Sequence, residues 1–106
     1  MAATYWALGE IDFATAATFS AELRRTIDSC DDATVGVDCS GVTFMGTAGF
    51  RVLVDATDHA ARQGRTLVIR NLSSSCTLLI GLCDSGGALL VEPAVPAGHS
   101  GRLRLA

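Results

Sequence analysis

Thr47 is the residue of this chain whose type and position best suit chemistry or regulation. It lies in the segment from Phe44 to Phe50, where a strand-like pattern gives way to a helix-like pattern. The first amides of a helix lack intrahelical partners, and the helix dipole makes that end partly positive. A hydroxyl there can cap the helix, and once phosphorylated it becomes the largest negative charge nearby. The position therefore predicts either a plain helix cap or a phosphoacceptor.

The sequence contains no arrangement typical of an enzyme active site. It has no Ser-His-Asp or Cys-His pattern, no P-loop or dinucleotide glycine motif, and no pair of acids with a reason to be perturbed. The glycines around Thr47 could hold a phosphate by backbone amides alone, which leaves anion or nucleotide binding as a minor alternative. We therefore predict a binding protein and not an enzyme, and we expect no cofactor.

Four cysteines, Cys30, Cys39, Cys76 and Cys83, form no C-x-x-C pair. Their wide spacing and the presence of only two histidines disfavour a zinc site, so no metal is expected. Cys39 falls in a strand pattern, and Cys76 and Cys83 fall in a helix pattern. We interpret them as small buried thiols.

Composition restricts the class of protein. A chain of 106 residues with 49% hydrophobic and 18% charged residues predicts one domain with a substantial core. The net charge of -3 disfavours nucleic-acid binding, which usually needs a basic surface. No apolar run approaches a membrane span and no signal-peptide pattern is present, so we expect a cytoplasmic protein.

Alternating strand and helix patterns predict a small α/β fold. Short connections imply right-handed crossovers and a mostly parallel sheet of about four strands with three or so helices, one sheet face being only partly covered. The predicted domain spans residues 1–92, and 93–106 form an irregular tail in which Gly101 to Ala106 could add an edge strand. The expected strands are Thr4 to Gly9, Ala33 to Cys39 (followed by a turn at Ser40-Gly41), Arg65 to Arg70 and Ala88 to Val91.

Helical periodicity marks the remaining elements. The first helix starts at Thr15 and ends before Asp31, the second runs from Thr47 to Gln63 with a stop at Gly64, and a third, short helix follows a capping cluster of serines. The expected apolar stripes are Ala16, Phe19, Leu23, Ile27 and Cys30 on the first helix, and Phe50, Leu53, Val54, Thr57 and Ala61 on the second; the short helix is Cys76 to Cys83, capped by Ser73, Ser74 and Ser75. Phe44 and Phe50 are expected in the core.

Three stretches together resemble the STAS domain family, the fold of bacterial anti-sigma factor antagonists that is also found in sulphate transporters. They are Leu8 to Asp12, Val37 to Phe50, and Gly64 to Asn71 with Leu79 to Leu82. The family reads G-E-L-D in the first stretch and roughly D-hydrophobic-S-x-V-x-F-hydrophobic-D-S-S/A-G-L in the second. The three stretches cover most of the chain.

The resemblance implies a protein-binding module that regulates transcription. Such antagonists bind an anti-sigma factor with a histidine-kinase-like ATP fold, and this binding frees the sigma factor. The kinase phosphorylates a Ser or Thr at the start of the central helix, here Thr47, and a phosphatase reverses the modification. The partner-binding residues that the resemblance indicates are Glu10, Asp12, Asp38, Gly46, Ala48, Gly49 and Phe50. Asp38 is alternatively a turn former at a strand end, and the other two acids are alternatively solvated.

Departures from the family pattern define a second hypothesis. The Asp that precedes the phosphoacceptor is Gly46 here, which we interpret as a position that uses the freedom of glycine to adopt positive φ. The acceptor is Thr and not the commoner Ser, and the family's first strand and C-terminal helix have no counterpart in the pattern. The alternative function is an STAS scaffold without phosphorylation, or an accessory subunit of a transport or signalling complex. A homodimer through an open sheet edge is a further alternative.

Overall fold

The computed structural model describes residues 3–84 and 86–92. Within these residues the chain forms one four-stranded sheet, in the order β1-β2-β3-β4, with every neighbouring pair parallel. The strands are β1 (Ala3–Ile11), β2 (Thr34–Met45), β3 (Thr66–Arg70) and β4 (Leu90–Val91), and the helices are α1 (Ala16–Ser29), α2 (Thr47–Arg62) and α3 (Ser74–Cys83). The predicted α/β fold is confirmed. The tail predicted at 93–106, with its possible strand from Gly101 to Ala106, lies outside the described residues.

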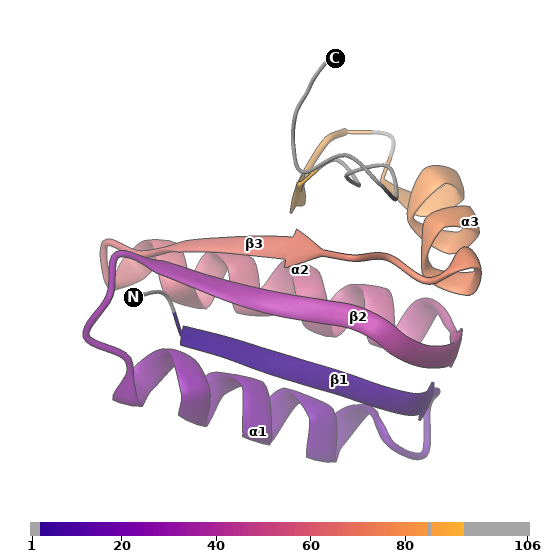
Figure 1. Cartoon of the computed structure of the whole chain (residues 1–106), viewed down its shortest axis with the longest axis horizontal. Coiled ribbons are helices and arrows are strands. Elements are labelled where there is room, and N and C mark those ends of the chain that lie inside the picture. Colours follow the sequence, from indigo (N-terminus) through magenta and orange to yellow (C-terminus); the bar gives the residue numbers. More distant parts are fainter. Residues whose placement is uncertain (1–2, 85, 93–106) are drawn as a thin grey trace, which may run out of the picture.

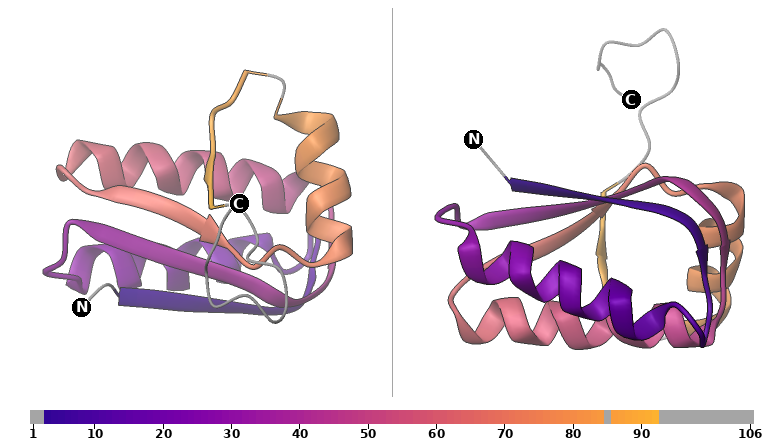
Figure 2. Two further views of the ribbon diagram at one scale, coloured as in Figure 1. Left: turned by 45° about the horizontal axis from the view of Figure 1, so that its top comes forward. Right: turned by 90° about the horizontal axis from the view of Figure 1, so that it is seen from below.

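Both long helices cover the same face of the sheet (Figure 1 and Figure 2, right). The strand order never reverses, and right-handed crossovers that continue in one direction keep their helices on one side. Helix α3 lies at the end of the sheet where the long strands β1 and β2 finish (Figure 1). No described helix covers the other face, where Trp6 and Leu8 of β1 are 62% and 72% exposed.

The core lies between the sheet and the helices α1 and α2. Helix α1 buries Phe19, Leu23 and Ile27, as its apolar stripe predicts. Helix α2 instead buries a face rich in small residues, made of Gly49, Val52, Leu53, Ala56 and Ala60. The stripe predicted for this helix is therefore wrong in phase, because the small residues Gly49, Ala56 and Ala60 let the helix pack closely on the sheet through this face. Phe50 and Val54 are only partly buried.

Strand β2 is longer than predicted because it continues through Ser40 and Gly41 to Met45, so the predicted turn is wrong. Its register against β1 shifts twice along this stretch. Extra residues on one strand produce a bulge that bends it. The Asp38 carboxylate accepts hydrogen bonds from the Ser40 amide at 2.9 Å and the Ser40 hydroxyl at 2.7 Å. The polar signal at this position therefore marks an irregularity within a strand.

The C-terminal end of α2 matches the predicted stop. Gly64 has a φ of +75°, in the left-handed region that favours glycine. The Arg65 amide donates to the Ala60 carbonyl at 2.9 Å, and the Gly64 amide donates to the Ala61 carbonyl at 3.0 Å. This pair of bonds is the Schellman arrangement, which ends a helix and turns the chain into the next strand.

Candidate functional site

The hydroxyl of Thr47 is free at the beginning of α2. The capping position is Gly46, with φ -92° and ψ 179°, and no side chain caps the helix. Thr47 is thus the first helical residue; its side chain is exposed and makes no hydrogen bond to the described part of the chain. The interpretation of Thr47 as a plain cap is wrong. An accessible hydroxyl beside helix-end amides is instead the geometry that a modification would need.

Backbone bonds hold the start of α2 against the end of β1. The Gly46 amide donates to the Ile11 carbonyl at 2.9 Å. The amides of Gly49 and Phe50 donate to the Gly46 carbonyl at 3.0 and 3.2 Å, which closes the first turn. These bonds fix the position of Thr47 relative to the strand ends.

The two glycines flanking Thr47 differ in what they permit. At Gly46 φ is negative, and an added Cβ would lie 3.5 Å from the nearest atom, in the Phe44 ring. Positive φ is therefore not the reason for glycine at 46, and a Cβ there would make only ordinary van der Waals contacts. At Gly49 an added Cβ would lie 2.8 Å from Ile11 Cγ2 and 2.9 Å from Met45 Cγ. Close approach of helix and strand thus requires glycine at 49.

Glu10 and Asp12 lie at the same end of the sheet as Thr47, because Ile11 between them contacts the start of α2. Asp12 shapes the loop into α1: its Oδ1 accepts from the Thr15 amide at 3.1 Å, and its own amide donates to Thr15 Oγ1 at 3.0 Å. The Thr15 hydroxyl donates to the Glu10 carbonyl at 3.0 Å. Asp12 is therefore engaged in the loop into α1, and the Glu10 side chain is exposed at this end of the sheet.

Asp38 lies elsewhere, in the middle of β2. About 20 Å of extended strand separates it from Met45, next to the start of α2. Besides Ser40, it accepts from Asn71 Nδ2 at 2.8 Å. Desolvation raises the pKa of Asp38, but the hydrogen bonds from Ser40 and Asn71 outweigh this and hold the pKa below its usual value. The structure thus does not bring Asp38 together with Thr47, and its bonds match the alternative of a local structural role.

Exposed apolar side chains lie at the same end of the sheet as the start of α2. Phe44 is 50% exposed, so its expected place in the core is wrong. It borders a shallow groove of about 230 Å³ between β2 and α3 that is lined by Phe44, Met45, Ser75, Leu78, Leu79 and Leu82. Phe13, in the loop after β1, is 90% exposed. We call the set Phe13, Phe44, Thr47, Leu78 and Leu82 the strand-end surface.

Sequence reasoning missed the contribution of α3 to this surface. Nearly every position from Cys76 to Cys83 is apolar, yet only Cys76 and Ile80 are buried. A helix that is apolar all round but packs on one side must expose the rest. The signal was therefore present in the sequence, because a short helix at the end of a small sheet has too few neighbours to cover it.

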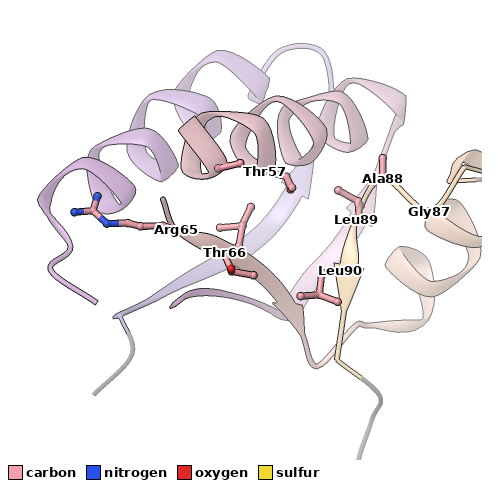
Figure 3. Close-up of a pocket in the computed structure, with 9 residues that line it drawn as sticks. Thr57, Arg65, Thr66, Gly87, Ala88, Leu89 and Leu90 are labelled. Atoms are coloured by element: carbon pink, nitrogen blue, oxygen red, sulfur yellow. The ribbon is translucent and has the colours of Figure 1, made fainter. Parts of the chain in front are cut away.

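A second hollow, of about 260 Å³, lies between α2 and the segment that leads into β4 (Figure 3). Arg65 is the charged residue among the described residues that line it. Its guanidinium points away from the other labelled side chains and donates to the Ile27 carbonyl and to Gln63 Oε1. This arginine is engaged in joining α2 to α1, so the hollow offers a ligand little charge recognition.

No group of three or more His, Cys, Asp or Glu side chains in residues 3–84 and 86–92 is arranged to hold a metal ion. The helices in the same residues are all too short or too polar to span a bilayer.

Comparison with known proteins identifies the family. The STAS domain model matches residues 4–84. Among solved structures, an anti-sigma factor antagonist from Mycobacterium paratuberculosis is 18% identical with a TM-score of 0.72, covering 85% of this chain and 75% of that one. The anti-sigma factor antagonist SpoIIAA in its unphosphorylated form is 13% identical with a TM-score of 0.67, covering 85% and 78%.

A third similar structure has a different context. The STAS domain of a SulP transporter from Vibrio cholerae is 23% identical with a TM-score of 0.60, covering 87% of this chain and 73% of that one. Comparison with curated protein sequences gave no match. At these identities the structures share the fold alone, whereas the family model covers most of the chain, and the chain therefore belongs to the STAS domain family.

Proposed function

We propose that this protein is an anti-sigma factor antagonist whose strand-end surface binds a kinase-like anti-sigma factor, and that phosphorylation of Thr47 weakens this binding. The observation that carries the proposal is the exposed Thr47 hydroxyl, unbonded among the described residues, at the first position of α2. Two of the similar structures are anti-sigma factor antagonists, which supports the same class of partner.

Physical chemistry explains how such a switch would work. A phosphate adds about 1.5 to 2 negative charges, which the amides at a helix N-terminus tolerate well. The fold would thus remain intact after modification. The same charge would lie one residue from Gly46, which the Phe44 ring approaches, in a surface whose binding energy would come from excluding water. A partner would then have to desolvate a dianion, which disfavours the complex.

The test is incubation with histidine-kinase-like anti-sigma factors encoded in the same genome, in the presence of ATP and Mg²⁺. Mass spectrometry should find one phosphate on Thr47, and the Thr47→Ala variant should bind the partner but stay unmodified. Thr47→Glu should bind at least tenfold more weakly than Thr47→Ala while showing the same circular dichroism. A phosphatase able to reverse the modification should restore binding.

Gly46 distinguishes the proposal from its alternative. The carboxylate that the family pattern places before the acceptor is missing, which favours a scaffold or accessory STAS domain that binds without being phosphorylated. Since a Cβ at 46 would make only ordinary contacts, we expect Gly46→Asp to fold normally and to increase the rate of Thr47 phosphorylation if kinase recognition needs the acid. Partner binding without phosphate on Thr47, in both the native chain and this variant, would establish the scaffold function instead.

A further inference from the structure

The outer edge of β1 has no partner strand among the described residues. β1 is first in the order of the sheet and pairs only with β2 there (Figure 1). Natural sheets protect a long edge with charges, prolines, bulges or a covering segment, because its unpaired N–H and C=O groups attract another strand. β1 is nine residues long, contains no proline, and carries Glu10 as its one charged residue. The extra residues at both register shifts belong to β2 and not to β1. We therefore expect a segment to cover this edge.

A shallow groove of about 250 Å³ lies beside the same edge. The described residues that line it come from β1, from the loop after it and from α1, and none come from β2, so the groove lies on the outer side of β1. Ala7 and Phe19 give it an apolar floor, and the Tyr5 hydroxyl donates to Glu22 Oε1 at 2.7 Å at its rim. A strand edge beside such a groove suits strand addition, in which main-chain hydrogen bonds hold an extended segment and alternate side chains enter the groove.

The two faces of an added strand would meet different chemistry. Side chains directed toward α1 would enter the apolar groove. Side chains directed the other way would lie on the uncovered face of the sheet, where Trp6 and Glu10 of β1 are exposed. Arginine pairs with carboxylates and stacks on indole rings. The edge therefore fits an extended segment in which apolar residues alternate with arginines.

We infer that residues 101–106 of the same chain, Gly-Arg-Leu-Arg-Leu-Ala, bind this edge as an added strand. These residues lie outside the described part of the chain, and their sequence has the required alternation. Leu103 and Leu105 would enter the groove, and Arg102 and Arg104 would face Glu10 and Trp6. The inference is independent of the proposed function, because no residue of the strand-end surface takes part in it.

The chain between the described residues and this segment is long enough to reach the edge. The Glu92 amide donates to the Ile69 carbonyl at 2.8 Å, so the described residues end beside β3. Four strand spacings separate β4 from a strand added outside β1, a distance of about 19 Å. Residues 93–100 can span about 26 Å when extended. The segment can therefore bind within one molecule.

Trp6 is the only tryptophan of the chain, so its fluorescence reports on this edge alone. Acrylamide should quench it with a quenching constant about twofold larger in the Leu103→Ser, Leu105→Ser variant than in the native chain, because loss of the added strand exposes the edge. Leu82→Ser changes an exposed leucine of α3 and is the matched control, for which we expect the native quenching constant. Circular dichroism confirms that both variants are folded. Equal quenching in the native chain and the double variant would overturn the inference.

Nuclear Overhauser effects in the native full chain give a direct readout that needs no variant. We expect contacts between backbone protons of residues 101–106 and those of β1. A sample that mixes two isotope labels on separate molecules should show no such contacts between molecules. The absence of contacts to β1, contacts to another part of the sheet, or contacts between two molecules would each overturn the inference.

Discussion

Helices α1 and α3 both pack beside α2, but their outer surfaces differ. Polar bonds close the boundary of α1 at its middle and near its end. Tyr5 Oη donates to Glu22 Oε1 at 2.7 Å at the middle of the helix, and near its end Asp28 Oδ1 lies 2.7 Å from His59 Nε2 and accepts from Gln63 Nε2 at 2.6 Å. These bonds give the apolar core beneath α1 a polar rim.

Helix α3 has a different boundary. Ser73 caps its first turn, accepting from the Cys76 amide at 3.4 Å, and Ser75 binds β2. On its outer side, Leu78 and Leu82 are 67% and 73% exposed. A surface of this kind, apolar and next to an accessible hydroxyl, is characteristic of a place where another molecule binds. The comparison teaches that α1 completes the domain, whereas α3 leaves apolar side chains exposed on its outer side.

We expect the largest difference in the free energy of unfolding between two truncations, Leu23→Ala in α1 and Leu82→Ala in α3. Leu23 is fully buried, so its truncation should lower the free energy of unfolding by about 2 to 5 kcal/mol. Leu82→Ala should change it by less than about 0.5 kcal/mol, because the side chain is already in water. Urea unfolding measures both values.

If the proposed function holds, Leu82→Ala should also weaken binding to the proposed anti-sigma factor partner, while a mild core variant such as Ile27→Val should not, provided that both remain folded. A loss of stability from Leu82→Ala as large as that from Leu23→Ala would mean that the outer side of α3 is packed, and the comparison would fail.

Two glycine substitutions test whether α2 and α3 differ in how closely they pack. At an exposed helix position, Gly→Ala raises the free energy of unfolding by about 0.5 to 1 kcal/mol. Gly81 of α3 has open space around it, so Gly81→Ala should stabilise the protein by about this amount. At Gly49 of α2 the new methyl group would overlap Ile11 and Met45, and overpacking costs about 1 to 3 kcal/mol.

Urea unfolding should therefore show a higher free energy of unfolding for Gly81→Ala than for the native chain, and a lower one for Gly49→Ala. If Gly49→Ala were as stable as the native chain, the close approach of α2 to the ends of β1 and β2 would not be real.

The sequence allowed the element order, the parallel sheet and the position of Thr47 to be predicted, because periodicity and helix-stop signals are local. It did not allow Gly46 and Gly49 to be told apart, since both look like turn residues until the distance between α2 and β1 is known. The turn predicted at Ser40-Gly41 was wrong for a similar reason, because a polar residue is as typical of a bulge within a strand as of a turn. Phe44 is exposed because few other residues surround the end of β2. The number of such neighbours cannot be predicted from a local sequence pattern.

The smallest expected effect is a change in the pKa of Tyr5, which lies at the polar rim of α1. Burial, followed by the hydrogen bond and negative charge of Glu22, raises the pKa of Tyr5 from 10.0 to about 12. Tyr5 is the only tyrosine of the chain, so the ultraviolet absorbance of tyrosinate reports it alone. Glu22→Gln should lower this pKa only in part, because burial is the largest cause. An unchanged pKa in this variant would show that the bond does not persist in solution.

The same shift makes stability depend on pH in a defined direction. A pKa raised in the folded state means that the folded protein holds its proton when the unfolded chain has lost it. The contribution of Tyr5 is therefore complete below about pH 10 and disappears as pH rises toward about 12. Glu22→Gln should reduce this alkaline loss, whereas Leu82→Ala should leave it unchanged, since the exposed side of α3 adds no titrating group to the boundary. The two helices would then differ in their response to pH as they differ in packing.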